Sequence, residues 1–390
     1  MKIYEIGTGY TPIPAQMGAA TEIVVEELTR SLLHIGQNAE ILDIKAEKRA
    51  ETDLPIKEVS VPKMFTKTDV SLGVMHKLKR VVYSLSLAST LKKLIKKSDE
   101  KIVLHFHNQY NLYFFLKLCP KKLREKVTIA YTVHSYIWGT EWEEIKDTVK
   151  KRYFQEIFCV KNADLVFVLN DITTDHFVNQ LGVDEKKIRK IINGVNTTIY
   201  SKKRDEQTAP LREKLGLCSK RVIFQVGSVC DRKNQLGTVL MLSEYLKKNR
   251  DVVFMYAGGI IDEEYQEHII DFAKNNGIEN QVKYAGELSP GKELSLYYAI
   301  SDLSVFTSQL ESFGLVVIEA IAAEKTVVVA NKLMFDLSSG YEIYSTKDEF
   351  VEKVDAILNG YQNNGRQEVI DKYDWDVVAK GHTELFSQIK

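Results

Sequence analysis

The stretch LSVFTSQLESFGLVVIEAIAAEKTVVVA, residues 303–330, predicts a strand, a helix and a second strand in succession. The runs LSVFT and TVVVA are short, apolar and rich in β-branched residues, as buried strands are. From Phe313 onward the apolar residues recur at helical spacing, which predicts a helix over residues 313–324. Such a unit is typical of a parallel sheet with right-handed crossovers. Two carboxylates, Glu311 and Glu319, interrupt a stretch otherwise suited to a buried core, which raises the question of their role.

The same alternation of strands and helices runs along the whole chain. In the first half the predicted strands are KIYEIG, AEILDI, KIVLHF, VTIAYTV, ADLVFVL and IRKIIN, with helices near residues 19–36, 76–98, 143–162 and 171–181. In the second half they are RVIFQVG, DVVFMYAG, QVKYAG, LSVFT and TVVVA, with helices near 235–249, 262–276, 291–300 and 313–324. The pattern stops and restarts at about 196–220, a polar segment that we interpret as a linker. The sequence therefore predicts an α/β protein with two doubly wound domains.

Composition agrees with a globular protein of two domains. The chain has 390 residues, 44% hydrophobic and 27% charged, with a formal net charge of zero. Its four cysteines show no CxxC spacing, so we expect no disulfide framework and a reducing, cytoplasmic location. The N-terminal MKIYEIGTGY does not resemble a signal peptide. No window approaches about eighteen unbroken apolar residues, so we expect no membrane span.

The loops after the strands are the expected ligand site. In doubly wound domains ligands bind beyond the carboxyl ends of the strands, so the cleft between two such domains is the candidate. After RVIFQV comes GSVCDRKNQ, where Gly227 allows close approach of the backbone to a ligand. Lys233 precedes a helix whose free amides favour an anion, and it could hold a phosphate as a point charge. The alternative is a solvated lysine in an exposed loop.

The loop after LSVFT carries the two glutamates. A helix N-terminus near Phe313 would present the free amides of Phe313, Gly314 and Leu315. Glu311 precedes this helix and Glu319 lies about two turns further on, so both can face the same cleft. Carboxylates accept hydrogen bonds from hydroxyls, which sugars and ribose offer in pairs. The alternative makes Glu311 a partner of the helix dipole and Glu319 an exposed surface residue.

The residues 307–330 resemble the E-x7-E signature of family 4 glycosyltransferases, which are retaining enzymes of the GT-B fold. Five further segments resemble parts of that family in the same order, from the N-terminal glycine loop to the C-terminal Tyr-x-Trp helix: PAQMGAATEIVVEEL, YTVHSY, KIINGVNTTIY, VGSVCDRKN and YDWDVVAKGHTELF. The resemblance covers most of the chain. It implies two facing Rossmann-like domains with an inter-domain cleft, residues 1–196 binding the acceptor, 200–372 binding the nucleotide sugar, and 373–390 crossing back to the first domain.

The resemblance also implies a role for each candidate residue. Glu311 would face the donor sugar, and Glu319 would bind the ribose hydroxyls of the nucleotide. Lys233 would stabilise the leaving phosphate, and His134 would lie at the reacting centre near the transferred sugar. Backbone groups would hold the diphosphate, and the remaining donor-side positions are Gly18, Gly227, Ser228, Arg232, Phe313, Gly314 and Leu315.

Three departures from the family pattern stand out. The arginine that usually follows the loop glycine is replaced by Ser228, so one positive charge is missing or is supplied by Arg232. The first glycine of the N-terminal pair is Met17. The segment NKLMFDLSSGYE lacks the usual Gly-Gly pair and is shorter, so it gives no basis for naming the donor sugar.

Two histidines and one basic helix allow more than one interpretation. His105 and His107 lie at a strand end and could bind a metal, but we find no further carboxylate or cysteine to complete a site. We expect His107 on the acceptor side and His105 in the core or a neighbouring turn. The helix at 76–98 has an apolar side formed by Leu78, Val81, Val82, Leu85, Ala88, Leu91 and Ile95, with lysines over much of the rest. It is either a crossover helix with a solvated basic face or a patch that binds an anionic bilayer at the inner face of the membrane.

The sequence thus predicts a retaining, metal-independent hexosyltransferase that uses a nucleotide-diphosphate sugar as substrate and needs no cofactor. Its acceptor would be a glycan, a lipid-linked or a small molecule, and no nucleic acid is expected as a partner. The string Asp374-Trp375-Asp376 could in principle hold a divalent ion, but we expect Asp374 to cap the last helix and Asp376 to suit its dipole. The alternatives are a non-hydrolysing sugar-nucleotide epimerase and a non-catalytic partner subunit.

Overall fold

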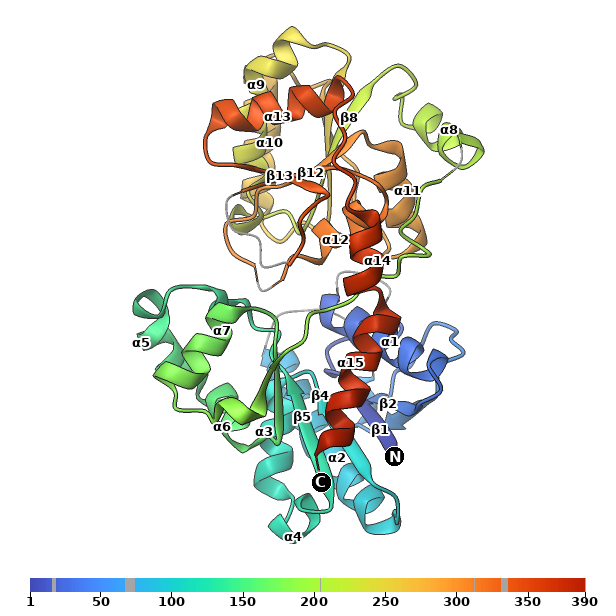
Figure 1. Cartoon of the computed structure of the whole chain (residues 1–390), viewed down its shortest axis with the longest axis vertical. Helices are drawn as coiled ribbons and strands as arrows, with labels where there is room; N and C mark the ends of the chain where they lie inside the picture. Colours follow the sequence, from blue (N-terminus) through green and yellow to red (C-terminus); the bar gives the residue numbers. More distant parts are fainter. Residues whose placement is uncertain (16–18, 67–73, 204, 312, 331–335, 390) are drawn as a thin grey trace. The chain divides into compact units, whose positions relative to one another are not determined.

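The computed structural model of the chain describes residues 1–15, 19–66, 74–203, 205–311, 313–330 and 336–389. It divides into two compact units (Figure 1). The first unit contains Met1–Gly194 and Trp375–Lys390, and the second contains Val195–Asp374. Each unit is built on its own parallel sheet, so the predicted pair of doubly wound α/β domains is confirmed.

The first unit has a sheet of seven strands in the order β3-β2-β1-β4-β5-β6-β7. Its central strands are apolar runs buried on both faces, as expected for a parallel sheet covered by helices. The change of winding direction lies between β1 and β4, which are neighbours. The strands are β1 (Lys2–Ile6), β2 (Asn38–Ile44), β3 (Ile56–Val59), β4 (Ile102–Phe106), β5 (Val127–Thr132), β6 (Leu165–Val168) and β7 (Ile188–Lys190).

The helices of the first unit include the last helix of the chain. They are α1 (Ala20–His34), α2 (Val74–Lys97), α3 (Gln109–Leu118), α4 (Lys121–Arg124), α5 (Trp142–Arg152), α6 (Phe154–Asn162), α7 (Asp171–Asp175) and α15 (Trp375–Gln388). Helix α15 packs along α1 (Figure 1). Its Trp375 is buried, and a Cβ on Gly194 would lie 2.5 Å from the Trp375 ring, so this contact requires a glycine.

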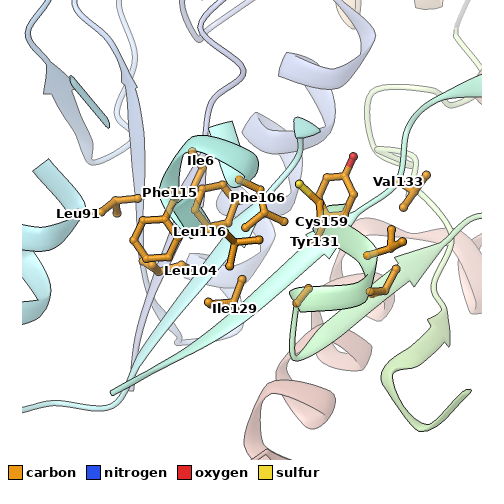
Figure 2. Close-up of a cluster of buried hydrophobic side chains, with 14 of the residues drawn as sticks. Ile6, Leu91, Leu104, Phe106, Phe115, Leu116, Ile129, Tyr131, Val133 and Cys159 are labelled. Atoms are coloured by element: carbon orange, nitrogen blue, oxygen red, sulfur yellow. The ribbon is translucent and has the colours of Figure 1, made fainter. Parts of the chain in front are cut away.

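One face of the first sheet forms an apolar core with α2, α3 and α6. Figure 2 shows Leu104 and Phe106 of β4 beside Ile129 of β5 and Phe115 of α3, all of them buried. Because side chains alternate along a strand, His105 points to the opposite face. There its ring centroid lies 5.4 Å from that of His382 in α15.

The second unit has a sheet of six strands in the order β10-β9-β8-β11-β12-β13, with the change of winding between β8 and β11. The strands are β8 (Arg221–Val226), β9 (Val252–Ala257), β10 (Val282–Tyr284), β11 (Leu303–Phe306), β12 (Val327–Ala330) and β13 (Tyr341–Tyr344). The helices are α8 (Asp205–Lys214), α9 (Gln235–Lys248), α10 (Glu263–Asn275), α11 (Lys292–Ile300), α12 (Leu315–Ala322), α13 (Lys347–Leu358) and α14 (Arg366–Tyr373).

The segment 196–220 is more structured than the linker that its composition suggests. It lies in the second unit and contains α8, which packs against α11. Pro210 lies inside this helix, and its polar sequence gives no strong apolar period. Helix propensity and apolar periodicity therefore do not predict α8, because its stability comes from packing against α11.

In the first half of α2, the residues that the sequence places on the apolar side are not the buried ones. Leu78, Val81 and Leu85 are 45%, 38% and 43% exposed. Tyr83 and Lys79 take the buried side instead, because their polar ends reach backbone acceptors there. The Tyr83 hydroxyl donates to the carbonyl of Gly7 at 3.1 Å, and Lys79 Nζ donates to the carbonyl of Tyr10 at 3.2 Å. None of the described helices is long and apolar enough to cross a membrane.

Candidate functional site

The loops after β8 and β11 are fixed to each other by buried polar side chains. The amide of Gln225 donates to the carbonyl of Lys233 at 2.8 Å and to the hydroxyl of Thr307 at 3.1 Å. The hydroxyl of Thr238 in α9 lies 2.8 Å from both Gln225 and Thr307. Asn234, just before α9, has a left-handed backbone with a φ of 60°. The loops after β8 and β11, where the strand order of the second sheet reverses, are therefore fixed to each other. Ligand sites of this fold class lie at such a point.

Lys233, Arg232 and Glu311 converge between these loops. Lys233 Nζ forms an ion pair with Oε1 of Glu311, and a guanidinium nitrogen of Arg232 lies 3.3 Å from the same oxygen. Arg232 also donates to the carbonyl of Leu310 at 3.0 Å. The side chains of Lys233 and Glu311 are only 13% and 16% exposed, so the alternative of a solvated lysine is wrong. Two cations share one carboxylate, which leaves a positive charge available to an anion.

Two glycines make room at this edge of the sheet. Gly227 follows β8, and a Cβ there would lie 3.1 Å from Cδ of Lys233. Gly314 has a φ of 85°, and a Cβ there would lie 2.9 Å from the ring of Phe306. Any side chain at either position would displace a neighbour or strain the backbone. Ser228 follows Gly227, and its carbonyl accepts from the amide of Gln235 at 3.0 Å.

Helix α12 begins at Leu315, slightly later than the sequence predicts, with Gly314 in the capping position. Phe313, shortly before this helix, is buried. The first amides of a helix have no acceptor inside it, so Leu315 and its neighbours supply donors at the end of β11. The predicted positions Phe313, Gly314 and Leu315 thus lie at the start of α12, close in sequence to Glu311.

The two glutamates of the opening stretch have different partners. Glu319 is half-buried in α12 and accepts from the hydroxyl of Tyr298 at 3.2 Å. Burial raises the pKa of Glu319 to about 7, although hydrogen bonds from Tyr200 and Tyr298 act in the opposite sense. The alternative of an exposed surface residue is therefore wrong for Glu319. The alternative of a simple dipole partner also fails for Glu311, which pairs with Lys233 and Arg232.

A second polar cluster lies in the first unit, where β1, β4 and β5 are neighbours. Glu5 is opposite His105 in the parallel register, and both are fully buried. Glu5 Oε2 lies 2.9 Å from Nδ1 of His105 and 2.7 Å from Nε2 of His107. His107 Nδ1 lies 3.0 Å from Nε2 of His134. The expectation that no carboxylate accompanies the two histidines is wrong, because Glu5 comes from a strand far away in sequence.

Hydrogen bonds join the ring nitrogens of this cluster to carboxylate oxygens, to a hydroxyl and to one another. His105 is in the core, as predicted, and its Nε2 lies 2.7 Å from the hydroxyl of Thr132. Burial would raise the pKa of Glu5, but the two histidines outweigh it and lower that pKa to about 2. Burial and the neighbouring His105 lower the pKa of His107 to about 4.

The loop that carries His134 is braced by a buried carboxylate. Glu156 of α6 accepts from the Tyr131 hydroxyl at 2.7 Å, from Ser135 at 3.0 Å and from Trp138 Nε1 at 2.9 Å. These donors lie on both sides of His134 in the sequence. Glu156 therefore fixes the segment between β5 and α5, a function that spacing along the sequence does not reveal.

Other predicted positions are not part of these clusters. Gly18, Met17 and residues 331–335 of the segment NKLMFDLSSGYE lie outside the described residues. Asp374 accepts from the hydroxyl of Thr197 at 2.5 Å, whereas Asp376 pairs with His34 at 2.7 Å. The two carboxylates of the Asp-Trp-Asp string thus have separate structural partners.

Comparison with known proteins defines the class. Residues 21–199 match the family model described as Glycosyltransferase Family 4, and residues 207–373 match the model described as Glycosyl transferases group 1. With the two parallel-sheet units already described, these matches define a glycosyltransferase of the GT-B fold. The chain belongs to the family 4 glycosyltransferases.

Individual relatives agree with this class. The chain is 23% identical over 346 residues to mannosylfructose-phosphate synthase of Agrobacterium fabrum, covering 82% of this chain and 74% of that enzyme. It is 25% identical over 275 residues to an uncharacterized glycosyltransferase of Methanocaldococcus jannaschii, covering 67% and 69%.

Solved structures show the same fold over the full chain. Sucrose-phosphate synthase from Thermosynechococcus elongatus matches with a TM-score of 0.74 and 17% identity, covering 100% of this chain and 98% of that one. Anabaena HepE in complex with UDP and glucose matches with a TM-score of 0.71 and 16% identity, covering 100% of both chains.

Proposed function

We propose that this glycosyltransferase moves a hexose-type sugar from a nucleotide-diphosphate sugar to an acceptor, with retention of the anomeric configuration. The observation that carries the proposal is the convergence of Lys233 and Arg232 on Glu311, which shortly precedes α12 in the sequence. Two cations and free helix amides at the change of winding suit a diphosphate. The acceptor would be a glycan, a lipid-linked or a small molecule, as in the synthesis of cell-surface polysaccharides or glycoconjugates.

Donor binding would rearrange the ion pair of Lys233. A diphosphate carries more negative charge than Glu311 and would take over Lys233 and Arg232. The Glu311 carboxylate would then accept hydrogen bonds from hydroxyls of the donor sugar, while Glu319 would accept from the ribose. Arg232 would supply the charge that Ser228 does not. Relatives support a sugar nucleotide as donor, since HepE was solved with UDP and glucose.

The chemistry would then depend on charge neutralisation and orientation. As departure of the diphosphate develops negative charge, Lys233 stabilises it more strongly than in the ground state. The leaving phosphate would take the proton of the acceptor hydroxyl, so no protein nucleophile is required. His134 would act at the transferred sugar, and His107 would act on that side through its contact with His134.

Association with an anionic bilayer is a second part of the proposal. Met75, Leu78 and Leu85 form an exposed apolar stripe on α2, with Met75 48% exposed. The exposed Lys93, Lys96 and Lys97 lie further along the same helix. Apolar side chains combined with lysines are what an interfacial helix presents to anionic lipid.

A thermal-shift panel tests the donor first. UDP-glucose, UDP-galactose, UDP-N-acetylglucosamine and GDP-mannose are compared, because a bound donor raises the melting temperature by mass action. The anomeric configuration of the product is then measured by NMR. Retention supports the proposal, whereas inversion would contradict it. A free epimeric sugar nucleotide would indicate an epimerase, and failure to turn over any donor would favour a non-catalytic subunit.

A further inference from the structure

Glu5, His107 and His134 form a line of hydrogen bonds that starts in the core and ends at a partly exposed ring. Glu5 is 0% exposed and His107 is 4% exposed. The first contact, from His107 Nε2 to Glu5 Oε2, is 2.7 Å long, and the second, from His107 Nδ1 to His134 Nε2, is 3.0 Å long. A buried line of this kind has a direction, because each neutral imidazole has one donor nitrogen and one acceptor nitrogen.

The direction follows from the carboxylate. An ionised carboxylate only accepts, so Nε2 of His107 must carry the hydrogen that it donates to Glu5. Burial lowers the pKa of His107 to about 4, so at neutral pH this ring has no second hydrogen. Its Nδ1 is therefore an acceptor, and the only hydrogen available for the next contact is on Nε2 of His134.

The same argument determines whether the other ring nitrogen of His134, Nδ1, carries a hydrogen. Burial, then His107 and His105, lowers the pKa of His134 well below its usual range, so this ring is also neutral. With its hydrogen on Nε2, the Nδ1 atom has a lone pair and no hydrogen. We infer that Glu5 and His107 are positioning residues that fix His134 in one tautomer, whose Nδ1 accepts a hydrogen bond from a hydroxyl of the transferred sugar.

The sugar hydroxyl in this inference rests on the proposed function, whereas the tautomer does not. Two groups on neighbouring elements, Thr132 and His382, do not reverse the direction of these hydrogen bonds. Thr132 of β5 contacts His105 and not His107. His382 of α15 lies against His105, and burial lowers its pKa to about 3. Both groups contact His105, whereas His107 contacts Glu5 and His134, so the carboxylate of Glu5 sets the direction.

Nitrogen-15 NMR of the intact chain with labelled histidine tests the tautomer directly. Protonated and unprotonated ring nitrogens have well-separated chemical shifts. A His134→Gln sample assigns the His134 signals. We expect Nε2 of wild-type His134 to carry hydrogen and Nδ1 to be bare at pH 7. An unprotonated Nε2, or a fully protonated ring, would overturn the inference even if the Glu5 and His107 variants do not fold.

Variants separate positioning from mere stability. Glu5→Leu and His107→Phe remove the acceptor or the link, so we expect the His134 signals to become a mixture of tautomers. Thr132→Val is the matched control, because it removes a buried hydrogen bond of the same cluster without touching the line. It should leave the His134 signals unchanged. Unaltered His134 signals in a folded Glu5→Leu sample would contradict the role of the carboxylate.

Turnover measurements test whether the tautomer of His134 affects transfer of the sugar. On whichever of the four panel donors binds, Glu5→Leu should lower turnover about tenfold to a hundredfold, the usual effect of one lost polar contact, and Thr132→Val should stay near wild type. Equal losses in both variants would reduce Glu5 to a structural residue. Absence of transfer by the wild type would count against the proposed function and leave the tautomer result standing.

Discussion

Lys233 and Glu311 lie 78 positions apart in the sequence and form an ion pair where β8 and β11 end. Arg232 shares the same carboxylate oxygen. The pair is mostly buried, so each partner compensates for the charge of the other. Removal of one partner therefore has an effect on stability that can be separated from its effect on catalysis.

Lys233→Ala should lower turnover by about a hundredfold to a thousandfold, because it removes a charge that stabilises the leaving diphosphate. It should also lower the free energy of unfolding by about 1–3 kcal/mol, since Glu311 loses a partner. Lys353→Ala is the matched control, because Lys353 pairs with Glu342 at 3.4 Å in the same unit. The turnover of Lys353→Ala should stay near that of the wild type. Near-normal turnover of Lys233→Ala would falsify the diphosphate assignment.

The double variant Lys233→Ala/Glu311→Ala refines this prediction. With both charges removed, no partly buried carboxylate is left unpaired, so denaturant unfolding should show part of the lost stability regained. Turnover should stay low, because neither the phosphate contact nor the sugar contact returns. Recovery of turnover together with stability would mean that Lys233 acts only through folding.

Glu319→Gln should weaken binding of UDP or GDP by about tenfold, the effect of a poorer acceptor for the ribose hydroxyls. It should change the Michaelis constant more than the turnover number, because this contact is similar in the ground and transition states. Glu22→Gln in the first unit is a suitable control, since burial also raises the pKa of Glu22 to about 7. Calorimetric titration that gives equal affinities for both variants would remove Glu319 from the nucleotide site.

The same variant gives a pH prediction. Burial raises the pKa of Glu319 from its ordinary 4.5 to about 7, so the folded state binds this proton more tightly than the unfolded state. The free energy of unfolding should therefore fall as pH rises from about 4.5 to about 7, by up to about 3 kcal/mol from this group. Urea unfolding at pH 5 and pH 8 should show a smaller fall in Glu319→Gln. An identical fall in both proteins would contradict the raised pKa.

Much of the fold could be predicted because buried parallel strands are apolar on both faces. The runs at β9 and β12 are of this kind, and those at β1, β4, β8 and β11 are mostly apolar. The edge strands β3 (IKEV) and β13 (YEIY) were missed, since edge strands are short and partly polar. The loop chemistry around Lys233 and Glu311 could be inferred because parallel strands bring their carboxyl ends to one edge.

The line from Glu5 to His134 could not be predicted in the same way. The sequence signal is a glutamate between the apolar positions of the strand KIYEI, and the sequence does not say which strand lies beside it. Strand order places β1 next to β4, and the register then sets Glu5 opposite His105. Pairing of distant strands is fixed by the whole sheet and not by local pattern.

Association with membranes can be tested by sedimentation with vesicles that contain phosphatidylserine or phosphatidylcholine alone. Reversal of Lys93, Lys96 and Lys97 to glutamate should weaken binding to the anionic vesicles by a hundredfold or more, at about 1 kcal/mol per charge lost. Reversal of the exposed Lys121 and Lys122 on α4 is the control and should have less effect. Wild-type protein that never sediments with anionic vesicles would leave the lysines as a solvated face.

The last prediction is that turnover survives an excess of EDTA. Lys233, Arg232 and the first amides of α12 offer positive charge to the diphosphate, which is the task that a divalent ion performs in other sugar-nucleotide enzymes. The carboxylates of Asp374 and Asp376 are engaged by Thr197 and His34. Asp374→Ala should therefore lower the melting temperature and leave turnover per folded molecule nearly unchanged. Complete loss of activity in EDTA, restored by magnesium or manganese, would show that an ion and not Lys233 carries the main charge on the leaving group.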